Sequence, residues 1–396
     1  MAESLDISAV REQFPALTRV EGSRVAAYLD GPGGTQTPLS VIEAMAGVLT
    51  RGVSNLGGGF GASDEAVRVT ARAREAMGRM LGADPSTISF GQNMTSLTFA
   101  ISRALGATWT EDDAILLTSL DHDANFTPWV MAAHDAGLEV RVAEVDTATG
   151  LLDTSAVTDL LDERVRLVAV CLASNALGSV VDVAAISEAA HQVGALVYVD
   201  GVHAAPHLAI DVSELGCDFL VVSAYKFFGP HTGILYGSPE VMASTSAYKV
   251  RPAPSDPPGK WETGTQSFES LAGVAAAVEY LESLGQERVA EHERTLGQQF
   301  LDGIAGMAHV ELFGIPEMDG ARVATFAVDV RAHHPHEVAR RMADAGIYVW
   351  SGHYYAVNVM DRLGVLDDGG LVRIGFVHYN IPDEVDRALD VLAELA

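Results

Sequence analysis

Short, continuous apolar runs alternate with helical segments through the middle of the chain. Each run is three to five residues long and ends in polar or glycine-containing turns. Strands of a parallel sheet have continuous apolar sequences because helices cover both faces of the sheet. The pattern therefore predicts an α/β fold with a large, mostly parallel sheet. The runs that we expect as strands are Ile88–Phe90, Ala114–Leu117, Val140–Val142, Leu167–Cys171, Leu196–Val199, Phe219–Val222 and Gly233–Tyr236.

The end of the chain has a different pattern, typical of a smaller α+β unit. It contains three expected strands, Val310–Phe313, Arg322–Val328 and Leu371–Phe376, and two expected helices, and Pro252–Gly259 has the composition of a linker. We expect an N-terminal segment (residues 1–30) packed with the small domain, a large domain (31–289) and a small C-terminal domain (290–396). The expected helices are Ala2–Ala16, Pro38–Leu49, Asp64–Leu81, Thr95–Leu105, Thr127–Ala136, Val183–Gln192, Leu271–Leu284, Glu337–Ala345 and Asp383–Leu395, with a mobile, glycine-rich loop at Asn55–Gly61.

Composition narrows the possible functions. The net charge of -28 argues against nucleic acid or an anionic membrane surface as a partner. Both cysteines, Cys171 and Cys217, lie in or beside apolar runs, which favours buried thiols in a reducing compartment. No signal peptide or membrane span is evident, so we expect a soluble, cytoplasmic protein. Three neighbouring histidines, His333, His334 and His336, sit in a polar turn without matching ligands, and we expect no metal site.

Lys226 is the most unusual residue of the pattern. The chain has only three lysines, and this one stands between two apolar runs, within Ser223–Pro230. A buried ammonium is costly, so such a lysine either snorkels to water or has a lowered pKa. A lysine of lowered pKa suits imine formation with a carbonyl group, including that of pyridoxal phosphate.

Polar residues follow four other expected strands, and the carboxyl ends of parallel strands form the ligand edge of an α/β sheet. Asn93, Met94 and Thr95 open a helix after the first strand and offer an anion site. Each residue has a simpler explanation, as a cap, a turn residue or a surface side chain. Together with Lys226, these strand-end residues offer a phosphate-binding site, an aromatic ring that can stack on a ligand ring, an amide, and a carboxylate for a pyridine nitrogen. The other members are His122, Asn175, Asp200, Ser223 and Tyr225.

Two features of the C-terminal unit suit a substrate pocket. Arg373 stands among apolar residues of the last expected strand and can clamp a carboxylate, unless it forms a structural ion pair. The loop Trp350–Tyr355 is aromatic enough to line a cavity.

These motifs together resemble the class V aminotransferase family of fold type I pyridoxal phosphate enzymes, and within it the cysteine desulfurase and selenocysteine lyase branch. The resemblance covers nearly the whole chain. It rests on five motifs in order: Asp121–Asn125, Ser174–Gly178, Asp200–His203, Ser223–Pro230 and Glu262–Thr265.

The resemblance implies a role for each matching residue. Lys226 would carry the cofactor as a Schiff base and act as a base, Asp200 would pair with the pyridine nitrogen, and His122 would stack on the ring. Asn175 and His203 would neighbour the ring hydroxyl. Arg373, with His353 nearby, would bind the substrate carboxylate. The phosphate would be bound by Asn93, Met94, Thr95, Ser223 and Tyr225, with Thr265 reaching across from the second subunit of a homodimer with shared active sites.

The loop at Gly352–Tyr355 departs from the desulfurase pattern, because a tyrosine stands where that branch carries its nucleophilic cysteine. We therefore expect cleavage of the C–S bond of a cysteine-derived amino acid by β-elimination, with Tyr354 or Tyr355 as the proton donor to the leaving group. Transamination, epimerisation or decarboxylation of another amino acid, and a non-catalytic homologue, remain open alternatives.

Overall fold

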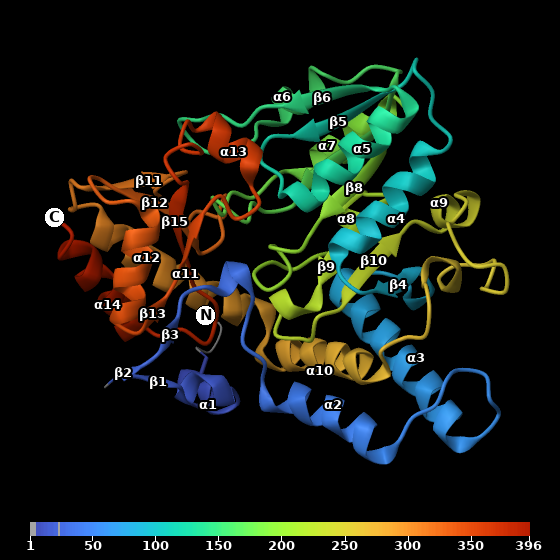
Figure 1. Cartoon of the computed structure of the whole chain (residues 1–396), viewed down its shortest axis with the longest axis horizontal. Helices are drawn as coiled ribbons and strands as arrows, with labels where there is room; N and C mark the ends of the chain where they lie inside the picture. The colour runs from blue at the N-terminus through green and yellow to red at the C-terminus, as the bar shows by residue number, and fades with distance from the viewer. Residues whose placement is uncertain (1–4, 23) are drawn as a thin grey trace.

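The computed structural model describes residues 5–22 and 24–396. Its centre is a seven-stranded sheet in the order β4-β10-β9-β8-β7-β5-β6, which Figure 1 shows in cyan to yellow-green. Strands β5 to β9 pair in parallel, and β10 runs antiparallel to both of its neighbours. The predicted mostly parallel sheet is thus confirmed. The strands are β4 (Ile88–Gly91), β5 (Ala114–Thr118), β6 (Glu139–Ala143), β7 (Val165–Cys171), β8 (Leu196–Asp200), β9 (Phe219–Ser223) and β10 (Gly233–Gly237).

Alternate residues of the central strands enter two different cores, one on each face of the sheet. In β7, Val168 and Val170 pack in one core, whereas Leu167 and Ala169 pack in the other. Strand side chains alternate between faces, so both faces of this sheet are buried, as the continuous apolar runs predicted. The covering helices are α2 (Leu39–Arg51), α3 (Gly61–Leu81), α7 (Val183–Gln192) and α10 (Phe268–Leu284) with the first core, and α4 (Met94–Gly106) and α5 (Thr127–Ala136) with the second.

The C-terminal part is built on a four-stranded antiparallel sheet, β11-β12-β15-β14. Its core includes the packed rings of Phe300, Phe326 and Phe376. The elements are α11 (Gln286–Ile304), β11 (Val310–Phe313), β12 (Thr325–Val330), α12 (Pro335–Asp344), β13 (Ile347–Tyr348), β14 (Trp350–Gly352), α13 (Val357–Arg362), β15 (Leu371–Gly375) and α14 (Pro382–Ala393). We call this part the small-sheet region and the part built on the seven-stranded sheet the large-sheet region.

The N-terminal segment connects the two regions. Strand β3 (Ala27–Tyr28) pairs in parallel with β13, and Asp30 forms a parallel bridge with Gly375. The predicted helix from Ala2 is shorter: α1 is Ile7–Glu12, and the first four residues lie outside the described part of the chain. The remaining short elements are β1 (Val20–Glu21), β2 (Arg24–Val25), α6 (Thr154–Thr158), α8 (Val212–Leu215) and α9 (Pro239–Ser244).

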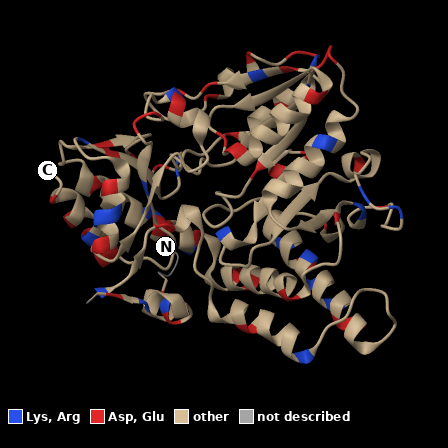
Figure 2. Ribbon diagram, in the orientation of Figure 1, with Lys and Arg blue, Asp and Glu red and all other residues tan. Residues whose placement is uncertain are grey.

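One sequence interpretation needs correction. Pro252–Gly259 is not a linker between domains, because α9 before it and α10 after it both pack in the large-sheet region. The expected boundary between residues 289 and 290 falls inside α11, a helix that the sequence analysis did not predict. This helix begins against the large-sheet core at Val289 and continues into the small-sheet core at Leu296. Acidic residues occur on the helices of both regions (Figure 2), and no described helix has both the length and the apolar character needed to cross a membrane.

Candidate active site

The polar strand ends meet at one edge of the large sheet. Strands β4 and β9 both run antiparallel to β10, so they are parallel to each other and end on either side of the start of β10. Gly233, the first residue of β10, pairs with the last residue of each. A Cβ atom on Gly233 would lie 2.4 Å from the backbone of Asn93, so only glycine lets the start of α4 approach this closely. The predicted anion site is thereby brought next to Lys226.

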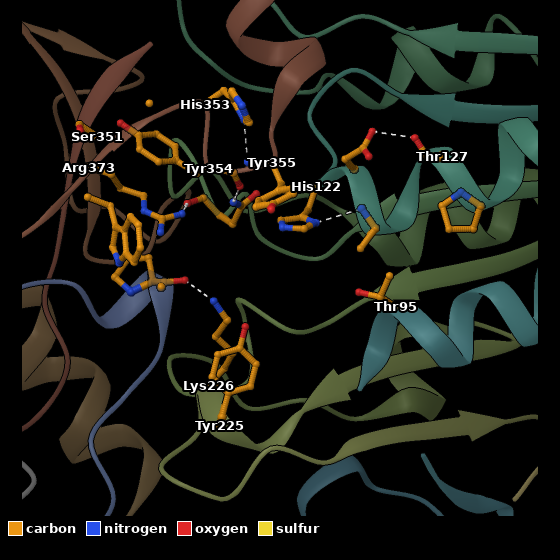
Figure 3. Close-up of a pocket in the computed structure, with 18 of the residues that line it drawn as sticks. Thr95, His122, Thr127, Tyr225, Lys226, Ser351, His353, Tyr354, Tyr355 and Arg373 are labelled. Carbon is orange, nitrogen blue, oxygen red and sulfur yellow. Dashed lines mark hydrogen bonds between the residues drawn. The ribbon is translucent and has the colours of Figure 1, made fainter. Parts of the chain in front are cut away.

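Two adjoining cavities lie at this edge, and the outer one is lined by both the large-sheet and the small-sheet regions. The outer one has a volume of about 690 Å³, within the usual range for small-molecule sites, and the inner one about 100 Å³. Lys226, His122, Thr95, Asn175 and Tyr225 line both. Figure 3 shows Lys226 opposite Arg373, with His122 on the same wall as the aromatic loop. The inner cavity is further lined by Asn93, Met94, Cys171, Asp200, His203 and Ser223.

Lys226 lies at the junction of the two cavities. Its Nζ donates a hydrogen bond to the carbonyl oxygen of Pro32, and lies 5.0 Å from the centre of the Tyr225 ring. Burial lowers the pKa of the Lys226 ammonium to about 7, and the Arg373 charge adds to this, while Asp200 and Asp30 oppose it. A substantial fraction of this lysine is therefore an uncharged amine near neutral pH.

Asp200 forms the floor of the inner cavity. It is buried, and its Oδ1 accepts a hydrogen bond from the N–H of Val202. Burial raises the pKa of this carboxyl to about 6, whereas the hydrogen bond and the Lys226 charge lower it. A cationic ring nitrogen above this carboxylate would be a strong partner for it.

The start of α4 is held by side chains that the sequence singled out. The Asn93 side chain caps the helix by accepting the Ser96 N–H at 2.9 Å. The Met94 N–H donates to the Ser223 hydroxyl at 3.1 Å, which fixes β9 to the helix. Thr95 borders both cavities, so the amino end of the helix and its dipole face the space beside Lys226.

His122 presents an aromatic ring to the site. Its Nδ1 accepts the Ala124 N–H at 3.0 Å, and the ring stacks on that of Tyr355. Burial lowers the pKa of His122 to about 4, with help from the Lys226 and Arg373 charges. The imidazole is therefore neutral at physiological pH, which suits stacking on a ring.

Arg373 forms the opposite wall. Its Nη1 donates to the backbone oxygen of Asn175 at 2.8 Å, and its guanidinium lies over the Tyr354 ring at 4.5 Å. Among the described residues no carboxylate pairs with it in a salt bridge, and its Nε is buried without a hydrogen-bond partner. The Asn175 Oδ1 is also buried and unpartnered. Such orphaned groups are costly unless a ligand satisfies them.

The aromatic loop is pinned over the outer cavity. The Tyr354 backbone oxygen accepts from Asn175 Nδ2, and that of Tyr355 accepts from the Asp123 N–H. Both tyrosines have positive φ, at 50° and 58°, a region that such residues rarely occupy. The Tyr354 hydroxyl donates to the Leu371 carbonyl, whereas His353 accepts the Tyr355 N–H and lines the outer cavity.

One predicted residue lies apart from the others. Thr265 is exposed, lines neither cavity, and receives a hydrogen bond of 3.4 Å from the Asn55 side chain of the glycine-rich loop. The glycine-rich loop Asn55–Gly61 also lines neither cavity within a single chain.

Sequence reasoning missed the contribution of the turn Asp30–Gly33. Pro32 and Gly33 line the outer cavity, and Asp30 places a second carboxyl near Lys226 and Arg373. Burial raises the pKa of Asp30 to about 6. The glycine- and proline-rich turn was visible in the sequence, but its position beside Lys226 was not. Phe99 and Trp350 also line the outer cavity.

The cavities satisfy the needs of pyridoxal phosphate: a buried carboxylate, an amine, a neutral ring, a helix amino terminus and unpartnered polar atoms. Fold and site together define a pyridoxal phosphate-dependent enzyme of fold type I. The chain belongs to the class V aminotransferase family, whose model matches residues 27–388. Pyridoxal phosphate is the cofactor of this family.

Named relatives include a probable cysteine desulfurase of Mycobacterium leprae, 33% identical over all of this chain and 66% of its own length. A cysteine desulfurase of Cronobacter sakazakii is 31% identical over 97% of each chain. This chain spans less than two thirds of the two mycobacterial relatives. Among solved structures, an apo cysteine desulfurase of Thermococcus onnurineus has a TM-score of 0.92 at 28% identity, covering 100% of this chain and 99% of that one. A cysteine desulfurase of Escherichia coli has 0.88 at 25%, covering 99% of each.

Proposed function

We propose that this chain is a pyridoxal phosphate-dependent lyase that cleaves the C–S bond of a cysteine-derived amino acid by β-elimination. The observation that carries this proposal is the position of Lys226. Its amine lies where a cavity suited to the cofactor meets a cavity suited to a substrate, opposite the unpaired Arg373.

The proposed cofactor contacts follow the inner cavity. Lys226 would hold the cofactor covalently, Asp200 would hold its pyridine nitrogen, and His122 would stack on its ring. Asn175 and His203 would neighbour its hydroxyl. We propose that its phosphate is bound by Asn93, Met94, Thr95, Ser223 and Tyr225 at the start of α4.

When bound, pyridoxal phosphate supplies a conjugated cationic ring that stabilises negative charge at the substrate Cα. In the proposed reaction, Arg373 would bind the substrate carboxylate, with His353 nearby. The substrate amine would replace Lys226 on the cofactor, and the freed, neutral Lys226 Nζ would accept the Cα proton. The Cβ–S bond then breaks, and the sulfur leaves with the bonding electron pair. Addition of water to the remaining three-carbon fragment gives pyruvate and ammonia.

The two loop tyrosines differ in their suitability as proton donors. The Tyr354 hydroxyl is bonded to the Leu371 carbonyl, and its ring packs under Arg373. Tyr355 is 66% exposed and borders the outer cavity. We therefore propose that Tyr355, rather than Tyr354, protonates the departing sulfur.

We propose that no thiol of this chain accepts the sulfur. Cys171 is buried, and burial raises the pKa of its thiol well above the usual range, with Asp121 and Asp200 adding to the shift. Cys217 is also buried, and its pKa is raised to about 12. A nucleophilic or persulfide-carrying cysteine needs the opposite, an accessible thiolate. The sulfur would then leave as a free thiol or sulfide.

We also propose a cytoplasmic homodimer with shared active sites, in which Thr265 enters the partner's site. Exposed apolar side chains on α2 and in the glycine-rich loop, Leu39, Ile42, Leu49 and Phe60, support a partner on this face. We further propose that the chain divides into a large domain (31–289) and a small domain (290–396). Light scattering of the purified protein would test the dimer.

The test of the activity is an absorption spectrum of the protein loaded with pyridoxal phosphate, before and after addition of L-cysteine or S-benzyl-L-cysteine. We expect a visible band that changes on addition, together with pyruvate and ammonia. A keto acid formed only in the presence of an amino acceptor would indicate transamination instead. A protein that binds no cofactor would refute the proposal.

A further inference from the structure

His203, on the wall of the inner cavity, is held in place from the other side of the site. It is buried, and its ring Nε2 lies 3.1 Å from the hydroxyl oxygen of Thr325. Thr325 is the first residue of β12 and is also buried. A residue of the small-sheet region thus contacts a cofactor-cavity residue of the large-sheet region. With Nε2 engaged, Nδ1 is the ring nitrogen that remains for a ligand in the cavity.

Thr325 has little freedom to move. Its N–H donates to the Val323 oxygen at 2.7 Å, and its own carbonyl accepts from Arg322 Nη2 at 2.7 Å. A Cβ on Gly178, which has a φ of 78°, would lie 2.5 Å from the Thr325 carbonyl oxygen. Glycine at position 178 therefore lets the large-sheet region close against this residue.

A second histidine packs against the His203 ring. The ring of His207 meets it edge to face, with centroids 5.2 Å apart. His207 Nδ1 is in turn bonded to the Glu293 carboxylate of α11 at 2.7 Å, and both side chains are buried. His203 is therefore confined between a hydroxyl and a buried imidazole–carboxylate pair, so its ring orientation is fixed.

We propose that Thr325 is a positioning residue that sets the tautomer of His203, so that Nδ1 carries the proton and points it at the ring oxygen of the cofactor. The Thr325 hydroxyl donates its proton to Nε2, which leaves Nδ1–H as the donor. A neutral imidazole has one donor and one acceptor nitrogen, and the partner of one nitrogen decides which. Burial, together with the charges of His207, Lys226 and Arg373, holds the pKa of His203 well below its usual range, so the ring is neutral.

This inference rests on the proposed function, since it concerns how His203 meets the cofactor. A merely structural hydroxyl would affect only folding. A positioning hydroxyl also changes the electronic state of the bound cofactor, because the hydrogen bond to the ring oxygen alters how that oxygen ionises.

The experiment compares Thr325→Val, Thr325→Ala and Thr325→Ser. Valine keeps the branched shape without the hydroxyl, and serine keeps the hydroxyl without the methyl. For each protein, the dissociation constant of pyridoxal phosphate, the absorption maximum of the bound cofactor and the melting temperature of the apoprotein are measured. If the Thr325→Val variant does not fold, the Thr325→Ala variant takes its place in the comparison.

We expect the valine and alanine variants to bind the cofactor about tenfold more weakly, with a shifted absorption maximum, and the serine variant to keep the wild-type spectrum. A wild-type dissociation constant and absorption maximum in the variants without the hydroxyl would overturn the inference. A serine variant that binds the cofactor as weakly as the valine variant would also overturn it. Failure of the wild-type protein to bind pyridoxal phosphate would instead refute the proposed function.

Discussion

The rings of His122 and Tyr355 are stacked, with centroids 5.5 Å apart and planes inclined by 22°. His122 follows β5 of the large sheet, and Tyr355 belongs to the loop after β14 of the small sheet. One face of the imidazole is therefore covered by the aromatic loop, and we propose that the other face takes the cofactor ring.

The Tyr355→Phe variant distinguishes the role of ring stacking on His122 from the role of the Tyr355 hydroxyl. The phenylalanine keeps the ring on His122, so cofactor affinity is expected to stay unchanged. Loss of the proton donor is expected to lower kcat for pyruvate formation about a hundredfold, the lower end for general acid catalysis. Steady-state kinetics with S-benzyl-L-cysteine measures this. Tyr248→Phe, at a tyrosine 67% exposed and outside both cavities, is the matched control. An undiminished kcat in Tyr355→Phe would show that the Tyr355 hydroxyl is not the proton donor.

Lys226→Ala is expected to abolish turnover, because the covalent attachment and the base are lost together. Reduction with borohydride followed by peptide mapping should find the cofactor on the peptide containing Lys226 in the wild-type protein. Lys249→Ala is the control, since Lys249 donates to the Ala253 carbonyl, outside both cavities. Full activity of Lys226→Ala would refute the assignment.

The pKa of Lys226 also predicts how the stability of the apoprotein depends on pH. The pKa of Lys226 is about 7 in the folded chain and 10.5 for an unperturbed lysine, so between these values the unfolded chain binds more protons. The cost of burying this charge is full below pH 7 and vanishes as the pH rises towards 10.5. Lys226→Met is therefore expected to raise the melting temperature at pH 6 by about a few degrees, and the gain should disappear near pH 10. A gain independent of pH would contradict the lowered pKa.

Arg373→Ala should weaken substrate binding while the cofactor still binds. A lost charge-assisted hydrogen bond to the carboxylate is expected to raise KM about ten- to a hundredfold. S-benzylcysteamine, which lacks the carboxylate, should bind equally well to both proteins when measured as an inhibitor. Arg362→Ala, at a half-exposed arginine 3.6 Å from Glu144, is the control. An unchanged KM in Arg373→Ala would show that another group binds the substrate carboxylate.

The local parts of the fold were predictable from sequence. The helix Val183–Gln192 has the predicted bounds, and the central strands differ from the prediction by no more than two residues at either end. Continuous apolar runs determine such strands because both faces are buried. The missed helix α11 also had a signal, since Val289, Leu296, Phe300 and Ile304 recur at helical spacing along a polar segment.

The closure of the site was not predictable by the same means. Lys226 and Pro32 are 194 positions apart, and Asn175 and Arg373 are 198 apart. Periodicity describes neighbours within a helix or strand, whereas these contacts depend on how whole elements pack. Strand ends on one sheet could be grouped because parallel order implies a common edge. No such rule links that edge to the turn at Asp30–Gly33 or to Thr325.

The bridge between Asp30 and Gly375 has a consequence for the synthesis of the chain. During translation, Lys226 leaves the ribosome long before Arg373 and Gly375, so the turn that bears Pro32 has no β15 to dock against. Until β15 arrives, the wall of the cavity that carries Arg373 is missing, and the charge of Arg373 does not yet lower the pKa of Lys226. Capture of the cofactor in its final environment therefore reports that the nascent chain has been made at least as far as β15.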